Sequence, residues 1–263
     1  MIRKISCALL GAVLTICSGM AVADGHEQEQ EQEQENRFRP IEVFACNYVG
    51  GKGMSDLKKV IGKWNAYMDG EKQHDYAAYT MTPVHYSEWA FDVAWVGVWR
   101  DGNSMGAGLE NYMATGGDID AEFSKVVNCQ SHSLYSSFRM RAGDSNDNND
   151  TQFVAGFSDC SVREGRTMND AFNAMQKWNA VRDEAGIVGA ESWWFPGAGN
   201  DDFEADFKAV SVIPDWKTVG ANYEKIIMDE LWRKRSDTVG EELDCDSGRT
   251  YNVTEHRGWG DNG

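Results

Sequence analysis

Basic residues are scarce in this sequence. Its 263 residues include 25 Lys and Arg against 42 Asp and Glu, which gives a formal net charge of −17. A surface of that sign repels the phosphates of nucleic acids and of anionic lipids. We therefore expect no nucleic acid partner for this protein.

A long hydrophobic run is also missing. The apolar stretch at residues 5–16 is too short to cross a bilayer. It follows Arg3 and Lys4 and precedes the small residues 21–23, which is the pattern of a secretory signal. Residues 1–23 are therefore predicted to be a cleaved signal peptide, with lipoprotein attachment at Cys17 or a membrane anchor as alternatives.

The predicted export determines the location and the formal charge that we expect for the mature chain. We expect it in the periplasm or outside the cell, without a membrane span, and loss of Arg3 and Lys4 takes its formal charge from −17 to −19. Residues 26–35 alternate mainly Glu and Gln and contain no apolar residue. Such a segment cannot bury anything, so residues 24–39 are predicted to be a disordered leader.

Several catalytic and metal-binding motifs are absent. No cysteines have the C-x-x-C spacing and no histidine pair lies nearby, so a zinc site is not expected. No serine or cysteine stands in a recognisable nucleophile elbow. Asp144, Asn146, Asn148 and Asp150 alternate as in a calcium loop, but its turn glycine and closing glutamate are missing. We interpret residues 142–151 as a polar linker and predict neither a metal nor a cofactor.

The sequence does contain an internal repeat. Residues 54–69 return as residues 168–183, 114 positions later, with seven of sixteen positions identical and Lys-Trp-Asn-Ala shared without interruption. Self-similarity of this kind indicates duplication of one unit. The two copies are predicted at residues 40–141 and 152–258, followed by a tail at 259–263.

The repeat also bears on the cysteines. Cys46, Cys129, Cys160 and Cys245 remain after the signal is removed, and an even number in an exported chain suggests disulfides with three possible pairings. Cys46 corresponds to Cys160 in the repeat, and Cys129 corresponds roughly to Cys245. This symmetry favours one bond within each copy, Cys46 to Cys129 and Cys160 to Cys245.

Hydrophobic periodicity predicts the same order of elements in both copies, strand, helix, two strands, helix and strand. In the first copy the elements are expected at residues 41–44, 55–68, 76–86, 91–99, 109–127 and 131–141. In the second copy they are expected at residues 153–160, 168–185, 190–195, 203–213, 219–243 and 250–256.

A βαββαβ unit of this size resembles the ferredoxin-like fold, an antiparallel sheet with both helices on one face. Two such units in one chain resemble the dimeric α/β-barrel superfamily, which includes antibiotic-biosynthesis monooxygenase-like proteins and chlorite dismutase-like haem proteins. The resemblance implies an α+β fold in which two ferredoxin-like repeats pack as an intramolecular barrel. It rests on topology, so it assigns no catalytic residue. For the haem branch, the second copy offers a single histidine, His256.

Two sets of side chains are candidates for a ligand site. Asn65 and Asn179 recur at the same helical position, where each could bind a ligand or tie its helix to a neighbouring strand. Trp64 and Trp178 precede them on the apolar stripe and are expected in the core. Aromatic residues of the paired strands form the second set, which comprises Tyr79, Tyr86, Trp89, Trp95, Trp99, Trp193, Trp194 and Phe195.

These aromatic residues could hold an apolar or aromatic ligand or fill the space between sheets. Trp95 and Trp99 align with Ala209 and Ile213, so at most one copy is expected to keep a pocket. His85 is the candidate general base, although a lone strand histidine is more often structural.

We therefore predict a non-catalytic exported protein that binds a small apolar or aromatic molecule or a protein partner. One alternative is a monooxygenase-like oxidoreductase that acts on an aromatic substrate through His85 and Asn65. The other is a structural protein associated with the cell envelope, in which self-association into a homo-oligomer closes the face of the barrel.

Overall fold

A computed structural model describes residues 38–88, 90–143 and 151–260. The predicted signal peptide, the calcium-loop-like part of the linker and almost all of the predicted leader lie outside the described residues, as does Trp89. Within the described residues, no helix is long and apolar enough to cross a membrane.

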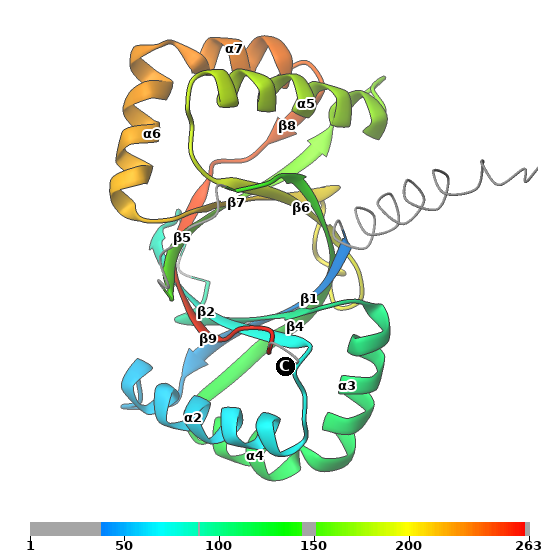
Figure 1. The fold of residues 1–263 in the computed structure, drawn as a ribbon, viewed down its shortest axis with the longest axis vertical. Coiled ribbons are helices and arrows are strands. Elements are labelled where there is room, and N and C mark those ends of the chain that lie inside the picture. Colours follow the sequence, from blue (N-terminus) through cyan, green and yellow to red (C-terminus); the bar gives the residue numbers. More distant parts are fainter. Residues whose placement is uncertain (1–37, 89, 144–150, 261–263) are drawn as a thin grey trace, which may run out of the picture. The chain divides into compact units, whose positions relative to one another are not determined.

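The described chain is an α+β structure whose strands close into a barrel (Figure 1). In the first half the elements are β1 (Phe38–Tyr48), α2 (Met54–Gly70), β2 (Tyr76–His85), β3 (Val93–Trp99), α3 (Gly102–Thr115), α4 (Gly117–Phe123) and β4 (Val127–Arg141). In the second half they are β5 (Gln152–Val162), α5 (Met168–Glu184), β6 (Ala190–Pro196), β7 (Phe207–Ile213), α6 (Trp216–Met228), α7 (Leu231–Thr238), β8 (Leu243–Cys245) and β9 (Arg249–Arg257).

Eight strands form the closed ring in the order β7-β6-β4-β1-β3-β2-β9-β5, and β5 pairs with β7 to complete it. All of these pairings are antiparallel, and the short strand β8 pairs with β5 outside the ring. The two halves therefore join at two seams, β2 with β9 and β4 with β6. Helices α2–α4 lie outside the strands of the first half and α5–α7 outside those of the second (Figure 1).

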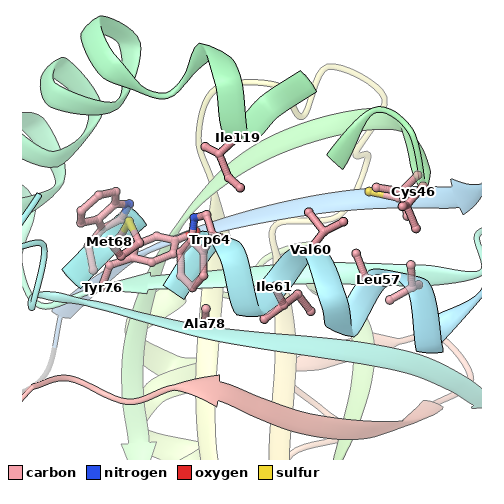
Figure 2. Packing of buried hydrophobic residues seen from close by; sticks show 13 residues of the cluster. Cys46, Leu57, Val60, Ile61, Trp64, Met68, Tyr76, Ala78 and Ile119 are labelled. Atoms are coloured by element: carbon pink, nitrogen blue, oxygen red, sulfur yellow. The ribbon is translucent and has the colours of Figure 1, made fainter. Parts of the chain in front are cut away.

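Strand alternation divides the core into three parts. One face of each strand points into the barrel, where Ile41, Val96, Val210 and Val253 are among the buried residues. The other face packs under the helices, which gives one part of the core in the first half and one in the second. Figure 2 shows this layer in the first half, where apolar residues of α2 line up between Ala78 of β2 and Ile119 of α4.

Helix starts follow capping residues that the periodicity alone did not reveal. Helix α3 begins at Gly102, seven residues before the predicted start. The Asp101 carboxylate accepts a hydrogen bond from the Ser104 backbone N–H, and the Ser104 hydroxyl accepts one from the Asp101 backbone N–H. The predicted helix at 219–243 is instead two helices. The helix is interrupted at Glu230, which adopts a left-handed backbone conformation with φ 52°.

Both predicted disulfides are present. Cys46 lies opposite Cys129 across β1 and β4, and Cys160 lies opposite Cys245 across β5 and β8. The bonds join residues 83 and 85 positions apart. In the chain-entropy model, a disulfide that closes a loop of that length stabilises the folded state by about 4 to 5 kcal/mol. The symmetry argument is confirmed, except that Cys245 belongs to a separate short strand before the closing strand.

The two equivalent asparagines make the same bond at opposite seams. Asn179 of α5 donates to the Met140 carbonyl at 2.8 Å, near the end of the first half's last strand. Asn65 of α2 donates to the His256 carbonyl at 3.0 Å, near the end of the second half's last strand. Each amide therefore ties a helix of one half to a strand of the other.

An arginine next to each of those carbonyls repeats the pattern. Arg141 donates to the Asp183 carboxylate at 2.7 Å and to the Ile187 carbonyl at 2.7 Å. Arg257 donates to Asp69 at 2.8 Å and to the Gln73 carbonyl at 2.9 Å. Both arginine side chains are about nine-tenths buried. The seams are thus closed by side chains as well as by strand pairing.

We predict that Arg141→Met lowers the free energy of unfolding by about 1.5 to 3 kcal/mol, because it removes charge-assisted bonds and leaves backbone carbonyls without a donor. Arg257→Met should behave alike at the other seam. The control is Arg233→Met, which breaks an exposed 3.6 Å pair with Glu230 and should cost less than about 1 kcal/mol. Chemical denaturation measures all three, and equal losses would contradict the seam's role.

Candidate functional site

A cavity lies outside the barrel, between the strands of the first half and helices α2, α3 and α4, and we call it the outer cavity. Its volume is about 900 Å³, which is within the range of small-molecule sites. Aromatic and aliphatic side chains form most of its wall. Among the described residues that line it, none is Lys or Arg, whereas Glu42, Asp120 and His132 are present.

Three of the predicted tryptophans line this cavity. Trp64 comes from the buried stripe of α2, and Trp95 and Trp99 come from the outward face of β3. The rings of Trp64 and Trp95 meet edge to face with centroids 4.9 Å apart. In Figure 2, Trp64 lies beside Tyr76 and Met68, two further residues of the cavity wall.

A buried carboxylate stands in the wall among these rings. Glu42 belongs to β1, and its side chain points to the helix layer because its neighbours Ile41 and Val43 face the barrel interior. The residue is only 5% exposed. The Trp99 indole donates to its Oε2 at 2.9 Å, and its Oε1 lies 3.0 Å from His132 Nε2. Both carboxylate oxygens are therefore engaged, as a buried charge requires.

His132 brings an imidazole from β4 to the same place. Its ring stacks on Phe44 at a centroid distance of 3.8 Å, and its side chain is half exposed. Because a carboxylate accepts hydrogen bonds, the nitrogen facing Glu42 is the one that carries the proton. In the tautomer with that proton, Nδ1 carries the lone pair, which is the arrangement of a base oriented by a carboxylate.

Tyr76 adds a hydroxyl to the cluster. It accepts a bond from the Trp95 indole at 3.0 Å, and burial together with the nearby Glu42 charge raises its pKa well above the usual value. Its ring crosses β3 at Gly97, where an added Cβ would lie 1.7 Å from the tyrosine oxygen. Trp99 likewise fits against Gly108 of α3, where a Cβ would lie 2.2 Å from the indole. Because these two positions are glycines, the rings of Tyr76 and Trp99 have room in the cavity wall.

The remaining predicted site residues lie elsewhere. His85 ends β2, where its Nδ1 lies 2.6 Å from the Thr250 hydroxyl and its ring contacts Trp216. Neither His85 nor Asn65 lines the outer cavity. Trp178 is buried beneath the second set of helices and Trp194 lies inside the barrel. The predicted ligand residues therefore do not form one group.

The second half has a different polar cluster in the corresponding layer. Its buried carboxylate, Glu191, accepts a bond from Arg182 at 2.6 Å. Arg182 also contacts the Asn179 oxygen. The space around this pair is filled by Trp193 and Phe207, both 0% exposed. An arginine neutralises this carboxylate where a histidine meets the first, so the two halves differ in chemistry as well as in packing.

Sequence reasoning missed Glu42 and His132. A signal was available for Glu42, because it is a charged residue within the apolar strand around Ile41, Val43 and Phe44. His132 follows Cys129, whose disulfide to Cys46 fixes β4 beside β1. The exact facing of the two side chains depends on the register shift between Ala45 and Cys46, which alternation does not predict.

The described residues offer neither a metal site nor, at His256, a haem ligand in the outer cavity. Among the described residues, no group of three His, Cys, Asp or Glu could hold a metal ion. His256, the histidine that the haem branch of the resemblance would offer, does not line the outer cavity, and its Nε2 lies 2.8 Å from the Thr80 hydroxyl. Burial lowers the pKa of His256 to about 4, with a smaller effect from Lys58. These contacts do not fit an axial ligand in that cavity.

Comparison with known proteins bears on the fold. No protein-family model and no curated protein matches the sequence. Among solved structures, a proposed monooxygenase from Fusobacterium nucleatum is 12% identical, with a TM-score of 0.53 over 84% of this chain and 92% of its own. A proposed monooxygenase from Lactobacillus acidophilus is 9% identical, with a TM-score of 0.51 over 83% and 93%. A proposed chlorite dismutase is 10% identical, with a TM-score of 0.50 over 83% and 96%.

These similarities support the predicted dimeric α/β-barrel type of fold. They also correct the functional prediction. The primary hypothesis of a non-catalytic binding protein is wrong by this comparison, because the similar structures carry the names of oxidoreductases. The alternative, a monooxygenase-like oxidoreductase, agrees with them better.

Proposed function

We propose that this protein is an oxidoreductase of the monooxygenase type that acts on a small aromatic substrate in the outer cavity. The observation that carries the proposal is the buried Glu42 carboxylate, held by Trp99 and paired with His132 in an aromatic wall. The fold shared with proposed monooxygenases supports the reaction class. His132 and Glu42 take the place of His85 and Asn65 as the reactive residues.

The pair supplies proton transfer. His132 Nδ1 accepts a proton from a phenolic hydroxyl of the substrate, and the Glu42 carboxylate stabilises the imidazolium that forms. A phenolate is richer in electrons than the phenol and so is oxidised more readily. The step balances when the product is a quinone: one oxygen atom of dioxygen replaces hydrogen on a ring carbon, and the other leaves as water with the hydrogens of that carbon and of the hydroxyl. The phenol itself supplies the four electrons, so no further reductant is required.

The lining favours an uncharged substrate. Glu42 and Asp120 repel anions, and the described lining residues include no Lys or Arg to attract them. Trp64, Trp95 and Trp99 offer flat apolar surfaces that suit a ring. A neutral phenol meets both conditions, and it acquires its negative charge only as the proton passes to His132.

The architecture and location of the protein are part of the proposal. The first half has the sheet order β4-β1-β3-β2 and the second half has β9-β5-β7-β6. This order supports an origin from two ferredoxin-like repeats, at residues 40–141 and 152–258. The two disulfides support export to the periplasm or beyond, where such bonds persist.

We predict that His132→Gln and Glu42→Gln each reduce turnover of a reactive phenol by about 10² to 10⁴-fold, the usual contribution of a positioned acid or base. The assay is oxygen uptake with a panel of phenols and naphthols, with and without an added reductant. His85→Gln is the matched control, because it makes the same chemical change outside the cavity and should retain full activity.

Equal turnover by the His132 and His85 variants would overturn the role of the pair. No oxygen uptake by the wild-type protein with any phenol of the panel would overturn the proposed reaction. Thermal unfolding of each variant separates loss of chemistry from loss of fold.

A second prediction concerns the wall of the cavity. Gly97→Ala must displace Tyr76, since its Cβ would overlap the tyrosine hydroxyl, and should cost about 1 to 3 kcal/mol of stability. It should also raise the KM for the phenol. Gly62→Ala is the control, because that helical glycine is exposed and, apart from its chain neighbours and the nearby backbone of its own helix, no atom lies within 4 Å of its Cβ position. Alanine should stabilise there by roughly 0.5 to 1 kcal/mol.

A further inference from the structure

A second cavity lies inside the barrel and has no part in the proposed reaction. Its volume is about 500 Å³. Aromatic rings form much of its wall, including Phe91 stacked on Tyr251 at 6.0 Å and Trp194 against Phe157 at 5.2 Å. A barrel interior can be filled by side chains, but this one leaves space of ligand size.

Unlike the outer cavity, this cavity has basic residues in its wall, and its described lining residues also include the exposed Glu88. Lys208 of β7 and Arg249 of β9 both line the space, and both belong to the set of side chains that point into the barrel. Their carboxylate partners, Asp159 and Asp246, are not among the lining residues. Asp159 lies on the same inward face of β5 as Phe157 and pairs with both cations, at 2.7 Å from Lys208 and 3.1 Å from Arg249. The cavity therefore meets the donors that these pairs leave open.

Both cations retain hydrogen-bonding capacity. Lys208 donates to Asp159 at 2.7 Å, and its ammonium also lies 4.2 Å from the Phe203 ring centre. The Arg249 Nε is buried and, among the described residues, has no hydrogen-bond partner. Burial lowers the pKa of Lys208 in spite of Asp159. A further anion beside these two residues would satisfy the open donor and offset that burial.

We infer that the barrel interior is a second binding site, for a small aromatic carboxylate. The carboxylate lies against Lys208 and Arg249, and the ring lies among Phe91, Trp194 and Tyr251. Tyr135 borders the same space, and burial, with a smaller effect from Asp159, raises its pKa to about 12, so its neutral hydroxyl is a further donor. The site is independent of the outer cavity, whose lining favours neutral rings.

Calorimetric titration of the full protein with benzoate tests the inference, with benzyl alcohol as the uncharged comparison. Benzoate should bind and benzyl alcohol should bind at least about tenfold more weakly, which is the effect of losing one charge-assisted bond. Lys208→Met and Arg249→Met should each weaken benzoate binding by about tenfold or more. Lys59→Met, which changes an exposed lysine on α2, should leave it unaltered.

Ala90→Trp is a further test that does not depend on removing a buried cation, which could prevent folding. Ala90 is exposed at the edge of this cavity, so a large side chain there should block entry without altering either cation. Loss of benzoate binding in this variant, with unchanged thermal unfolding, supports the inner site. Absence of benzoate binding to the wild-type protein, or binding that survives all three lining substitutions, overturns it.

Discussion

The structure depends on two reciprocal seams. At each, the amide of one helix holds the last strand of the other half, and the arginine that follows the bonded carbonyl reaches back to that helix and the loop after it. Strand pairing alone would allow the sheet to open at β2 with β9 or at β4 with β6. Because the ties cross between halves, neither half can move away without leaving buried donors and carbonyls unsatisfied.

The two halves differ above this common base. The ties are equivalent in both, whereas the layer under the helices is not. In the first half Gly97 and Gly108 make room for Tyr76 and Trp99, and a cavity remains. In the second half Trp193 and Phe207 fill the corresponding layer and Arg182 neutralises the buried acid. A scaffold with one stabilising half can retain a cavity and a buried carboxylate in the other.

The sequence predicts the scaffold better than the site because the two depend on different information. Periodicity locates the strands and helices, and the symmetry of Cys46 with Cys160 favours the disulfide pairing that the structure contains. Capping by Asp101 and the break at Glu230 are single-residue effects that periodicity does not detect. The pairing of Glu42 with His132 joins residues 90 positions apart through a strand register that contains an irregularity. His85 is the histidine that the strand pattern singles out, yet it lies on another part of the surface.

The environment of Glu42 argues for a site prepared before any substrate arrives. A carboxylate that is 5% exposed loses most of its hydration, and hydrogen bonds to both oxygens replace it. Trp99 is itself fixed against Gly108, and His132 is fixed by Phe44. The imidazole therefore has little freedom to rotate away from the acid. In the proposed reaction the pair is therefore in its reactive arrangement before proton transfer begins, which is the condition under which a positioned base is most effective.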